Sequence, residues 1–335
     1  IMAYRIGIVG TGGISRHHGR AARLVKNAEL GAVCDRSPEA LERFDEEFQI
    51  EERYLDLEEM LAAANLDIAI IATWGSSHAE IAQRIAASGK VRPILCEKPI
   101  SSTAAECEAM FAAAEASDVL LAEAFKFRFH PQHLKAKELV QEGAIGQLCN
   151  IRSTFTVAVD PRTRTPENNW RFNPLQGGGA VYDLGCYNLH HARFITGTEP
   201  LQLFALGFPG ARSGVDESTA VLLEFPGEIS AQFSLSHAYF NTQYAEISGT
   251  RGMVRIQQAW NNENQPVAIE LHSRDGNQRF DFDPVDQFVL QLEHLCATLD
   301  QGTPHRIPAS NSIANMKAMD AIFTSIKTGK PVKLA

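Results

Sequence analysis

The chain has 335 residues, of which 44% are hydrophobic and 21% charged, a composition typical of a soluble globular protein long enough for two domains. Its 40 acidic and 31 basic residues give a formal charge of −9, so the surface repels phosphate backbones and we expect no nucleic-acid partner. No apolar run reaches the ~20 residues of a membrane helix, and the six cysteines show no CxxC spacing. We therefore expect no membrane span, no disulfide framework, no signal peptide and a cytoplasmic location.

The first third of the chain alternates short apolar runs with helical patterns. The strand-like runs are 4–9, 29–35, 66–73, 93–97 and 119–125. The helical patterns between them are 15–26, 37–48, 78–89 and 103–117. Strands that alternate with helices in this way predict a parallel, doubly wound sheet.

A glycine-rich loop, GTGGIS, follows the first strand-like run at residues 10–15. Gly10 and Gly12 take the first two glycine positions of G-x-G-x-x-G, and Ser15, a small residue, takes the third. Glycines here let the backbone approach a pyrophosphate, and the helix that follows directs its N-terminal amides at the anion. Because the loop lies between a strand and a helix, we predict that it binds a dinucleotide.

The second strand-like run ends in an acid, Asp35, which would accept hydrogen bonds from the adenosine ribose hydroxyls. Its charge would repel a 2′-phosphate and favours NAD, whereas the neighbouring Arg36 could pair with that phosphate and favours NADP. We expect NAD, with NADP as the alternative.

A Glu-Lys-Pro sequence, residues 97–99, ends the strand-like run 93–97. Ligands of open α/β sheets lie outside the carboxyl ends of the strands, so Lys98 is expected to point into the cofactor crevice. With GTGGIS, FRFHPQ (127–132), GAIGQL (143–148) and GGGAVYDLG (177–185), this sequence resembles the glucose–fructose oxidoreductase/inositol dehydrogenase family, Gfo/Idh/MocA, over nearly the whole chain.

The resemblance implies an α/β protein with a Rossmann domain, residues 1–125, and a second domain, residues 126–335, with a large, mostly antiparallel open sheet for substrate binding and oligomerisation. It also implies NAD(P)-dependent oxidation or reduction of sugars, inositols or related polyols. Lys98 would lie beside the nicotinamide and the reacting carbon, and the subunits would form a homodimer or homotetramer. The family commonly has Thr-Pro-x-x-x-His where this chain reads TWGSSH, so Thr73 and His78 match while Trp74 replaces the proline.

The remaining chain reads as strand-like runs separated by turns, which predicts an antiparallel sheet, and ends in two helices at about 284–301 and 310–328. Residues 160–176 form a long polar loop, and loops of this kind are often functional. We expect its Trp170 and Arg171 to line a polar substrate pocket, with a mobile surface loop as the alternative.

The stretch YDLGCYNLHHARFITG, 182–197, concentrates polar groups on an expected helix from Val181 or Tyr182 to Ile195. At about 100° per residue, Tyr187 and His190 lie within about 40° of Asp183, whereas His191 lies about 80° away. Spacing alone leaves a catalytic site and a buried structural cluster equally open. Many relatives have Asp-x-Gly-x-His here, with the histidine as acid/base. Tyr187 in its place resembles the sugar or dihydrodiol dehydrogenase branch, where a tyrosine takes that role.

These residues predict hydride transfer between nicotinamide and a carbon of a small polyhydroxylated substrate. Two alternatives remain, a zinc site and a non-catalytic NAD(P)-binding sensor or structural protein. A zinc site is disfavoured because the adjacent histidines diverge on a helix and the sequence has no HExxH motif. We expect no metal. The catalytic candidates are Lys98, Asp183, Tyr187 and His190. The cofactor-binding candidates are Gly10, Thr11, Gly12, Gly13, Ile14, Asp35, Arg36, Thr73, Trp74, His78, Glu97 and Lys98. The substrate-binding candidates are Lys98, Arg128, Trp170, Arg171, Asp183 and Tyr187.

Overall fold

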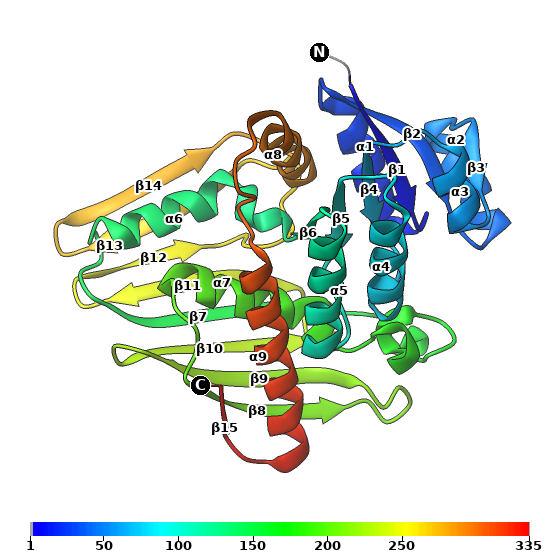
Figure 1. Cartoon of the computed structure of the whole chain (residues 1–335). Coiled ribbons are helices and arrows are strands. Elements are labelled where there is room, and N and C mark those ends of the chain that lie inside the picture. Colours follow the sequence, from blue (N-terminus) through cyan, green and yellow to red (C-terminus); the bar gives the residue numbers. More distant parts are fainter. Residues whose placement is uncertain (1–2, 335) are drawn as a thin grey trace. The chain divides into compact units, whose positions relative to one another are not determined.

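The computed structural model describes residues 3–334, which fall into two compact units. The first unit consists of Ile1–Lys126 and Asp286–Ile313, and the second of Phe127–Val285 and Ala314–Ala335. Figure 1 shows the elements of both units along the chain. Each unit has a sheet of its own, so the two are described separately.

The first unit contains a parallel six-stranded sheet in the order β3-β2-β1-β4-β5-β6, which is the order of a dinucleotide-binding Rossmann sheet. Its strands are β1 (Tyr4–Val9), β2 (Ala28–Cys34), β3 (Glu52–Tyr54), β4 (Ile68–Ile71), β5 (Pro93–Glu97) and β6 (Leu120–Ala124). Its helices include α1 (Gly13–Leu24), α2 (Pro38–Phe48), α3 (Leu57–Ala63), α4 (His78–Ser88) and α5 (Ala104–Ala116). All four residues of β4 and all five of β5 are buried, as expected for central parallel strands.

A helix from late in the chain completes the first unit. Helix α8 (Gln287–Gln301) packs on α1, and its Phe288, Leu292 and Leu295 join the same hydrophobic core as the strands β1 and β4. The expected second domain, 126–335, therefore differs from the structure, because residues 286–313 group with the first unit. The apolar face of a helix is visible in the sequence, but the surface against which that face packs is not.

The second unit contains a nine-stranded sheet in the order β14-β13-β12-β11-β7-β10-β9-β8-β15. Only β7 and β10 pair in parallel, and every other neighbouring pair is antiparallel. The strands are β7 (Leu148–Thr156), β8 (Gln202–Pro209), β9 (Asp216–Phe225), β10 (Ile229–Ser236), β11 (Thr242–Gly249), β12 (Gly252–Ile256), β13 (Val267–Ser273), β14 (Gly276–Phe282) and β15 (Val332–Lys333). The unit thus has the expected large, mostly antiparallel sheet.

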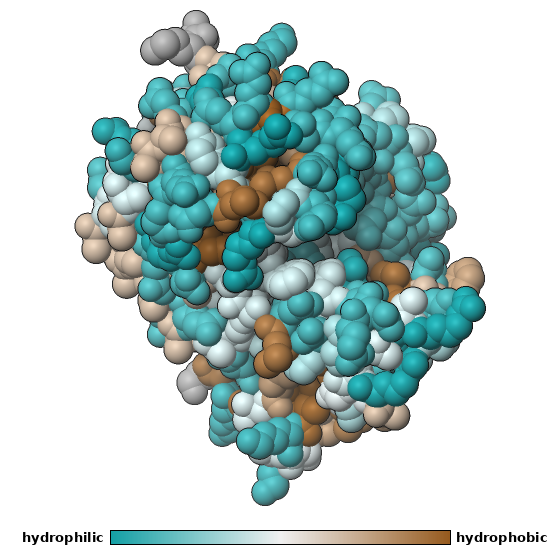
Figure 2. All heavy atoms as spheres, turned by 90° about the vertical axis from the view of Figure 1, so that its right-hand side faces the viewer, coloured by the Kyte–Doolittle hydropathy of each residue, from teal (hydrophilic) through white to brown (hydrophobic). Residues whose placement is uncertain are grey.

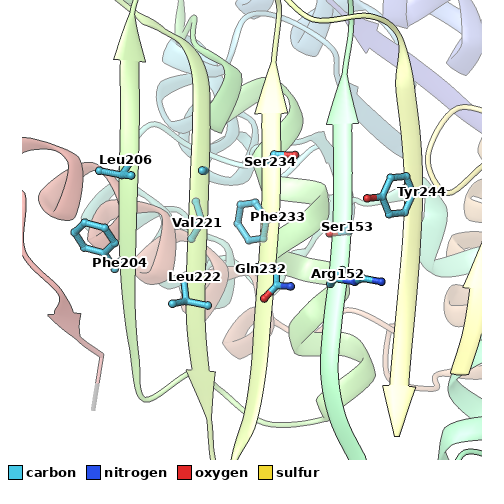
Figure 3. A pocket seen from close by; sticks show the side chains of 11 residues that line it. Arg152, Ser153, Phe204, Leu206, Val221, Leu222, Gln232, Phe233, Ser234 and Tyr244 are labelled. Carbon is cyan, nitrogen blue, oxygen red and sulfur yellow. The ribbon is translucent and has the colours of Figure 1, made fainter. Parts of the chain in front are cut away.

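Helices cover one face of this sheet and leave the other face open. The covering helices are α6 (Pro131–Gln141), α7 (Cys186–Thr196) and α9 (Ala309–Thr328), the last from Ala314 onward (Figure 1). On the opposite face, side chains of β8, β9, β10, β7 and β11 line a shallow groove of about 350 Å³ (Figure 3). Along β9 the burial alternates strictly from Val221 to Phe225, as expected for a strand with one covered face.

The polar stretch 182–197 differs from the plain α-helix that its spacing predicts. A π-helical turn, Val181–Gly185, precedes α7, and every residue from Cys186 to Ile195 is buried. A π turn changes the angle between successive side chains, so the 100° spacing does not hold between Asp183 and Gly185, and the angles from Asp183 to Tyr187 and His190 differ from those predicted. Turns of this kind occur often at functional sites.

The surface of the molecule agrees with its composition. Figure 2 shows one face on which hydrophilic residues predominate and hydrophobic residues form small scattered groups. Among residues 3–334, no helix combines the length and the hydropathy that crossing a membrane would need.

Candidate active site

The glycine loop of the first unit contains one glycine at which a side chain would clash, Gly10, and two beside which there is free space, Gly12 and Gly13. Gly10 has a φ of +92°, and a Cβ there would lie 2.8 Å from the carbonyl carbon and oxygen of Ala72. A Cβ on Gly12 or Gly13 would have no atom within 4 Å. No side chain caps the N-terminus of α1, which starts at Gly13. The open glycines and uncapped amides fit the phosphates of a dinucleotide.

Asp35 connects this loop to the end of β2. Its Oδ2 accepts hydrogen bonds from the backbone N (2.8 Å) and the Oγ1 (3.0 Å) of Thr11, and its Oδ1 accepts one from the N of Ser37 (2.9 Å). Arg36 is exposed beside it, and Ile14 packs against the core. The sequence-predicted acid therefore lies at the loop, with its carboxylate held in place from two sides.

The loops after β4 and β5 are tied together by His78. This buried ring has Nδ1 3.0 Å from the carbonyl oxygen of Pro99 and Nε2 3.2 Å from that of Thr73, and burial lowers its pKa. The Lys98–Pro99 peptide is cis. Trp74, next to Thr73, is 46% exposed. His78 thus connects the Thr73 loop to the Glu-Lys-Pro turn. The sequence predicted residues of both segments as cofactor contacts, but not this connection between them.

A buried His–Glu pair lies directly beside Lys98. His18 Nε2 is 2.7 Å from Glu97 Oε1, and Glu97 Oε2 accepts a 3.2 Å hydrogen bond from the backbone N of Lys98. Burial alone would raise the pKa of Glu97, but the hydrogen bond and charge of His18, together with Lys98, lower it. Sequence reasoning missed His18, although its position inside an expected helix was visible.

Phe288 of α8 closes this region of the first unit. Its ring stacks on His17 with 4.8 Å between ring centroids, and it meets His18 edge-on at 5.2 Å. The Lys126 Nζ lies 5.1 Å from the centroid of the same ring. The helix from late in the chain therefore packs directly on the His18–Glu97 pair that supports Lys98.

In the second unit, Asp183 lies at the centre of a polar cluster. Arg171 donates a 2.7 Å hydrogen bond from Nε to Asp183 Oδ2, and the Arg171 guanidinium stacks on Trp170 at 4.7 Å. His237 Nε2 lies 3.7 Å from the same Asp183 oxygen. Asp183 and His237 are buried, whereas the side chain of Arg171 is 39% exposed. Arg171 of the loop 160–176 thus contacts Asp183, while sequence reasoning missed His237.

Tyr187 is 5% exposed and surrounded by aromatic rings. The centroids of Phe155, Trp260 and Phe127 lie 5.7, 6.0 and 6.1 Å from its own. Rings at such distances and inclined to one another hold an aromatic side chain in a defined orientation. The structure therefore fixes the Tyr187 ring by packing.

His190 has different neighbours from Asp183. Its Nε2 is 2.8 Å from Nη1 of Arg128, and since a guanidinium only donates, this histidine nitrogen accepts. Arg128 is buried and stacks on Phe194 at 4.2 Å. Burial and the charge of Arg128 hold the pKa of His190 well below its ordinary value. The structure thus places His190 and Arg128 in an internal pair.

His191, the next residue of α7, is also buried. Burial and the Arg128 charge lower its pKa to about 3, so it stays neutral. Within residues 3–334, no group of three or more histidine, cysteine, aspartate or glutamate side chains has the arrangement of a metal site.

Comparison with known families and proteins connects both units to one group. The model of an oxidoreductase family with an NAD-binding Rossmann fold, GFO/IDH/MocA, matches residues 4–125. The model of the GFO/IDH/MocA C-terminal domain matches residues 133–255. Together the two matches cover more than half of the chain.

Individual proteins resemble the chain over most of its length. D-xylose 1-dehydrogenase (NADP+) 2 of Haloferax volcanii is 30% identical over 98% of this chain and 99% of its own. Trans-1,2-dihydrobenzene-1,2-diol dehydrogenase of Mus musculus is 34% identical over 77% of this chain and 76% of its own. The crystal structure of aldose-aldose oxidoreductase from Caulobacter crescentus complexed with glycerol matches with a TM-score of 0.88, 26% identity and 99% coverage of both chains.

Proposed function

The chain belongs to the GFO/IDH/MocA oxidoreductase family, and we propose that it oxidises or reduces a hydroxyl-bearing carbon of a sugar, inositol or related diol with NAD(P). The observation that carries this proposal is the presence, in one chain, of an open glycine loop with a Glu-Lys-Pro turn and of a buried Asp183 carboxylate, bound by a partly exposed Arg171, in the same helical segment as an oriented tyrosine. The relatives named above act on a sugar and on a diol, which supports catalysis over a non-catalytic sensor.

The cofactor, when bound, accepts or donates a hydride, and the chain's residues supply the proton chemistry. We assign Lys98 the role of binding the reacting oxygen and stabilising negative charge on it. Tyr187 is the proposed acid/base, because its hydroxyl belongs to a ring whose orientation is fixed by packing. Gly10, Gly12 and Gly13 would hold the phosphates, and Asp35 the adenosine ribose.

Asp183 and Arg171 are the proposed substrate-binding pair. The Asp183 carboxylate can accept a hydrogen bond from a substrate hydroxyl, while Arg171 holds its Oδ2 and is itself partly exposed. Because the two charges compensate each other, we propose a neutral polyhydroxylated substrate rather than an acid. Trp170, stacked on Arg171, would limit the pocket on one side.

We propose that His190 supports the site and does not transfer the substrate proton. Its accepting nitrogen is occupied by Arg128, and its buried ring resists protonation, so it is poorly suited to take a substrate proton. We propose that His190 orients Arg128 and that both support the aromatic packing around Phe127.

We propose NAD as the preferred cofactor, because Asp35 is held facing the glycine loop by Thr11 and Ser37, where its charge would repel a 2′-phosphate. NADP is the alternative, because the exposed Arg36 could pair with its 2′-phosphate. We further propose a cytoplasmic location, which the six free cysteines support.

We also propose that two copies of the chain pair through the open sheet face, as a homodimer or homotetramer. Leu206, Phe208 and Leu222 are at least half exposed there, and Figure 3 shows Leu206 and Leu222 beside Phe204 on the neighbouring strands β8 and β9. Contiguous exposed apolar side chains of this kind mark interaction surfaces.

The test is a screen of NAD+ and NADP+ reduction across aldoses, inositols and trans-diols, read at the absorbance of the reduced cofactor. We expect turnover on at least one class, with a higher kcat/KM for NAD+ than for NADP+. Binding of a reduced cofactor without turnover on any of these compounds would instead establish the sensor alternative.

A further inference from the structure

The helix that carries Asp183 and Tyr187 begins without a cap from its own sequence. It starts at Ala180, and no local side chain accepts a hydrogen bond from its first amides. The first backbone amides of a helix have no partner within the helix and need an acceptor from elsewhere. Asp216, the first residue of β9, supplies one: its Oδ2 accepts a 2.8 Å hydrogen bond from the N of Val181.

The carboxyl of Asp216 is itself held in place. Its Oδ2 also accepts a 3.1 Å hydrogen bond from the Oγ1 of Thr219, a residue that is 2% exposed. Thr219 and Asp216 belong to the same strand, so the cap is anchored in the sheet rather than in a loop. An aspartate that accepts from the first amides of a helix is the usual capping arrangement, here made across 35 residues of chain.

Gly179 makes room for this contact. A Cβ at this position would lie 2.3 Å from Asp216 Oδ1, and its φ of +121° disfavours any other residue. The same glycine donates from its N to the carbonyl oxygen of Arg171 (2.8 Å) and accepts at its own carbonyl oxygen from the N of Asp183 (3.1 Å). Gly179 therefore joins the cap, the substrate loop and the first turn of the helix.

We propose that Asp216 is a positioning residue for the reaction, capping the helix at Val181 and thereby fixing the register at which Asp183 and Tyr187 leave it. This inference rests on the proposed function for its catalytic consequence, but not for the capping itself. Asp183 lies two residues after the capped amide and Tyr187 six, so a shift at the helix start moves both. Misplacement of reacting groups by about 1 Å can cost on the order of a hundredfold in rate.

The experiment compares Asp216→Ala with Asp216→Asn, whose amide oxygen can still accept from Val181. We expect Asp216→Ala to lower kcat by on the order of ten- to a hundredfold, with affinity for NADH within about twofold of the wild type. Asp216→Asn should recover most of the lost rate. Asp281→Asn, which alters an exposed carboxyl on β14, is the matched control and should behave like the wild type.

Amide hydrogen exchange over residues 180–187 tests the cap without any turnover. Exchange should accelerate in Asp216→Ala and not in Asp216→Asn. Gly179→Ala, which would push the carboxyl away, is the second variant and should accelerate the same amides, so the test survives if Asp216→Ala does not fold. Unchanged exchange in folded Asp216→Ala, or equal activity of the Ala, Asn and wild-type proteins, overturns the inference. If the wild type turns over no polyol, the proposed function fails while the exchange data still decide on the cap.

Discussion

At the scale of single residues, the structure separates polar groups that the sequence placed together. Asp183 is bound by Arg171 and approached by His237, whereas His190 pairs with Arg128. The sequence could name Asp183 and Tyr187, because both belong to a motif with a family resemblance. It could not name His18, Asp216 or His237, since the partner of each is distant in the chain.

The roles of Tyr187 and His190 can be separated by substitution. Tyr187→Phe removes only the hydroxyl and keeps the ring packed against Phe155 and Trp260, so the fold should be unchanged. We expect kcat to fall on the order of a hundredfold or more, as for loss of an acid/base group, with NADH affinity retained. Steady-state kinetics and NADH titration check this. A Tyr187→Phe protein that is nearly fully active beside an inactive, folded His190→Ala protein would reverse the assignment.

The ionisation of Asp216 gives a second prediction at this scale. Burial raises its pKa from 3.8 to about 7, against the opposing hydrogen bonds from Val181 and Thr219. Because the pKa is higher in the folded than in the unfolded chain, this group stabilises the fold fully below pH 3.8, and that stabilisation is lost as the pH rises through 7. Asp216→Asn cannot ionise.

We therefore expect the stability of Asp216→Asn, relative to the wild type, to increase between about pH 5 and pH 8, as measured by denaturant unfolding. The exposed-carboxyl variant Asp281→Asn should show no such trend. A constant difference between Asp216→Asn and the wild type across this range would argue against the raised pKa.

At the scale of elements, local signals in the sequence predicted most of the first unit. The strand 93–97 agrees with β5 at both ends, and the glycine loop opens α1 as expected. The π-helical turn at Val181–Gly185 was not predictable, because periodicity arguments assume the spacing of a regular α-helix. The placement of α8 was not predictable either, because it depends on contacts between segments that are far apart in sequence.

Helix α8 provides a test of that placement. Phe288 is 2% exposed and contacts His17, His18 and Lys126 of the first unit. Phe288→Ala should lower the free energy of unfolding by about 3–5 kcal/mol and weaken cofactor binding, because the cavity lies beside the pair that supports Lys98. Phe288→Leu, which keeps most of the volume, should cost less. Denaturant unfolding and NADH titration provide the measurements, and wild-type values for Phe288→Ala would refute this role.

At the scale of the whole molecule, family membership defines the chemistry, and we have proposed that copies of the chain associate through the exposed sheet face. Leu222 lies between Phe204 and Gln232 on neighbouring strands and is 51% exposed. Leu222→Glu should convert the assembly to monomers, because a buried, unpaired charge is unfavourable in an interface. Light scattering gives the mass directly. Leu24→Glu, at an exposed leucine of α1, is the control. A wild type that is already monomeric, or a Leu222→Glu protein of unchanged mass, would contradict the proposal that copies associate through this surface.

Hydride transfer between substrate and nicotinamide is tested most directly by following the hydrogen that moves. The best substrate from the cofactor-reduction screen is prepared with deuterium on the carbon that is oxidised, and the reduced cofactor is analysed by mass spectrometry. We expect one deuterium on the nicotinamide with the wild-type protein, and none with Lys98→Met, although that variant still binds the cofactor. Reduced cofactor without deuterium, or full label transfer by Lys98→Met, would contradict it.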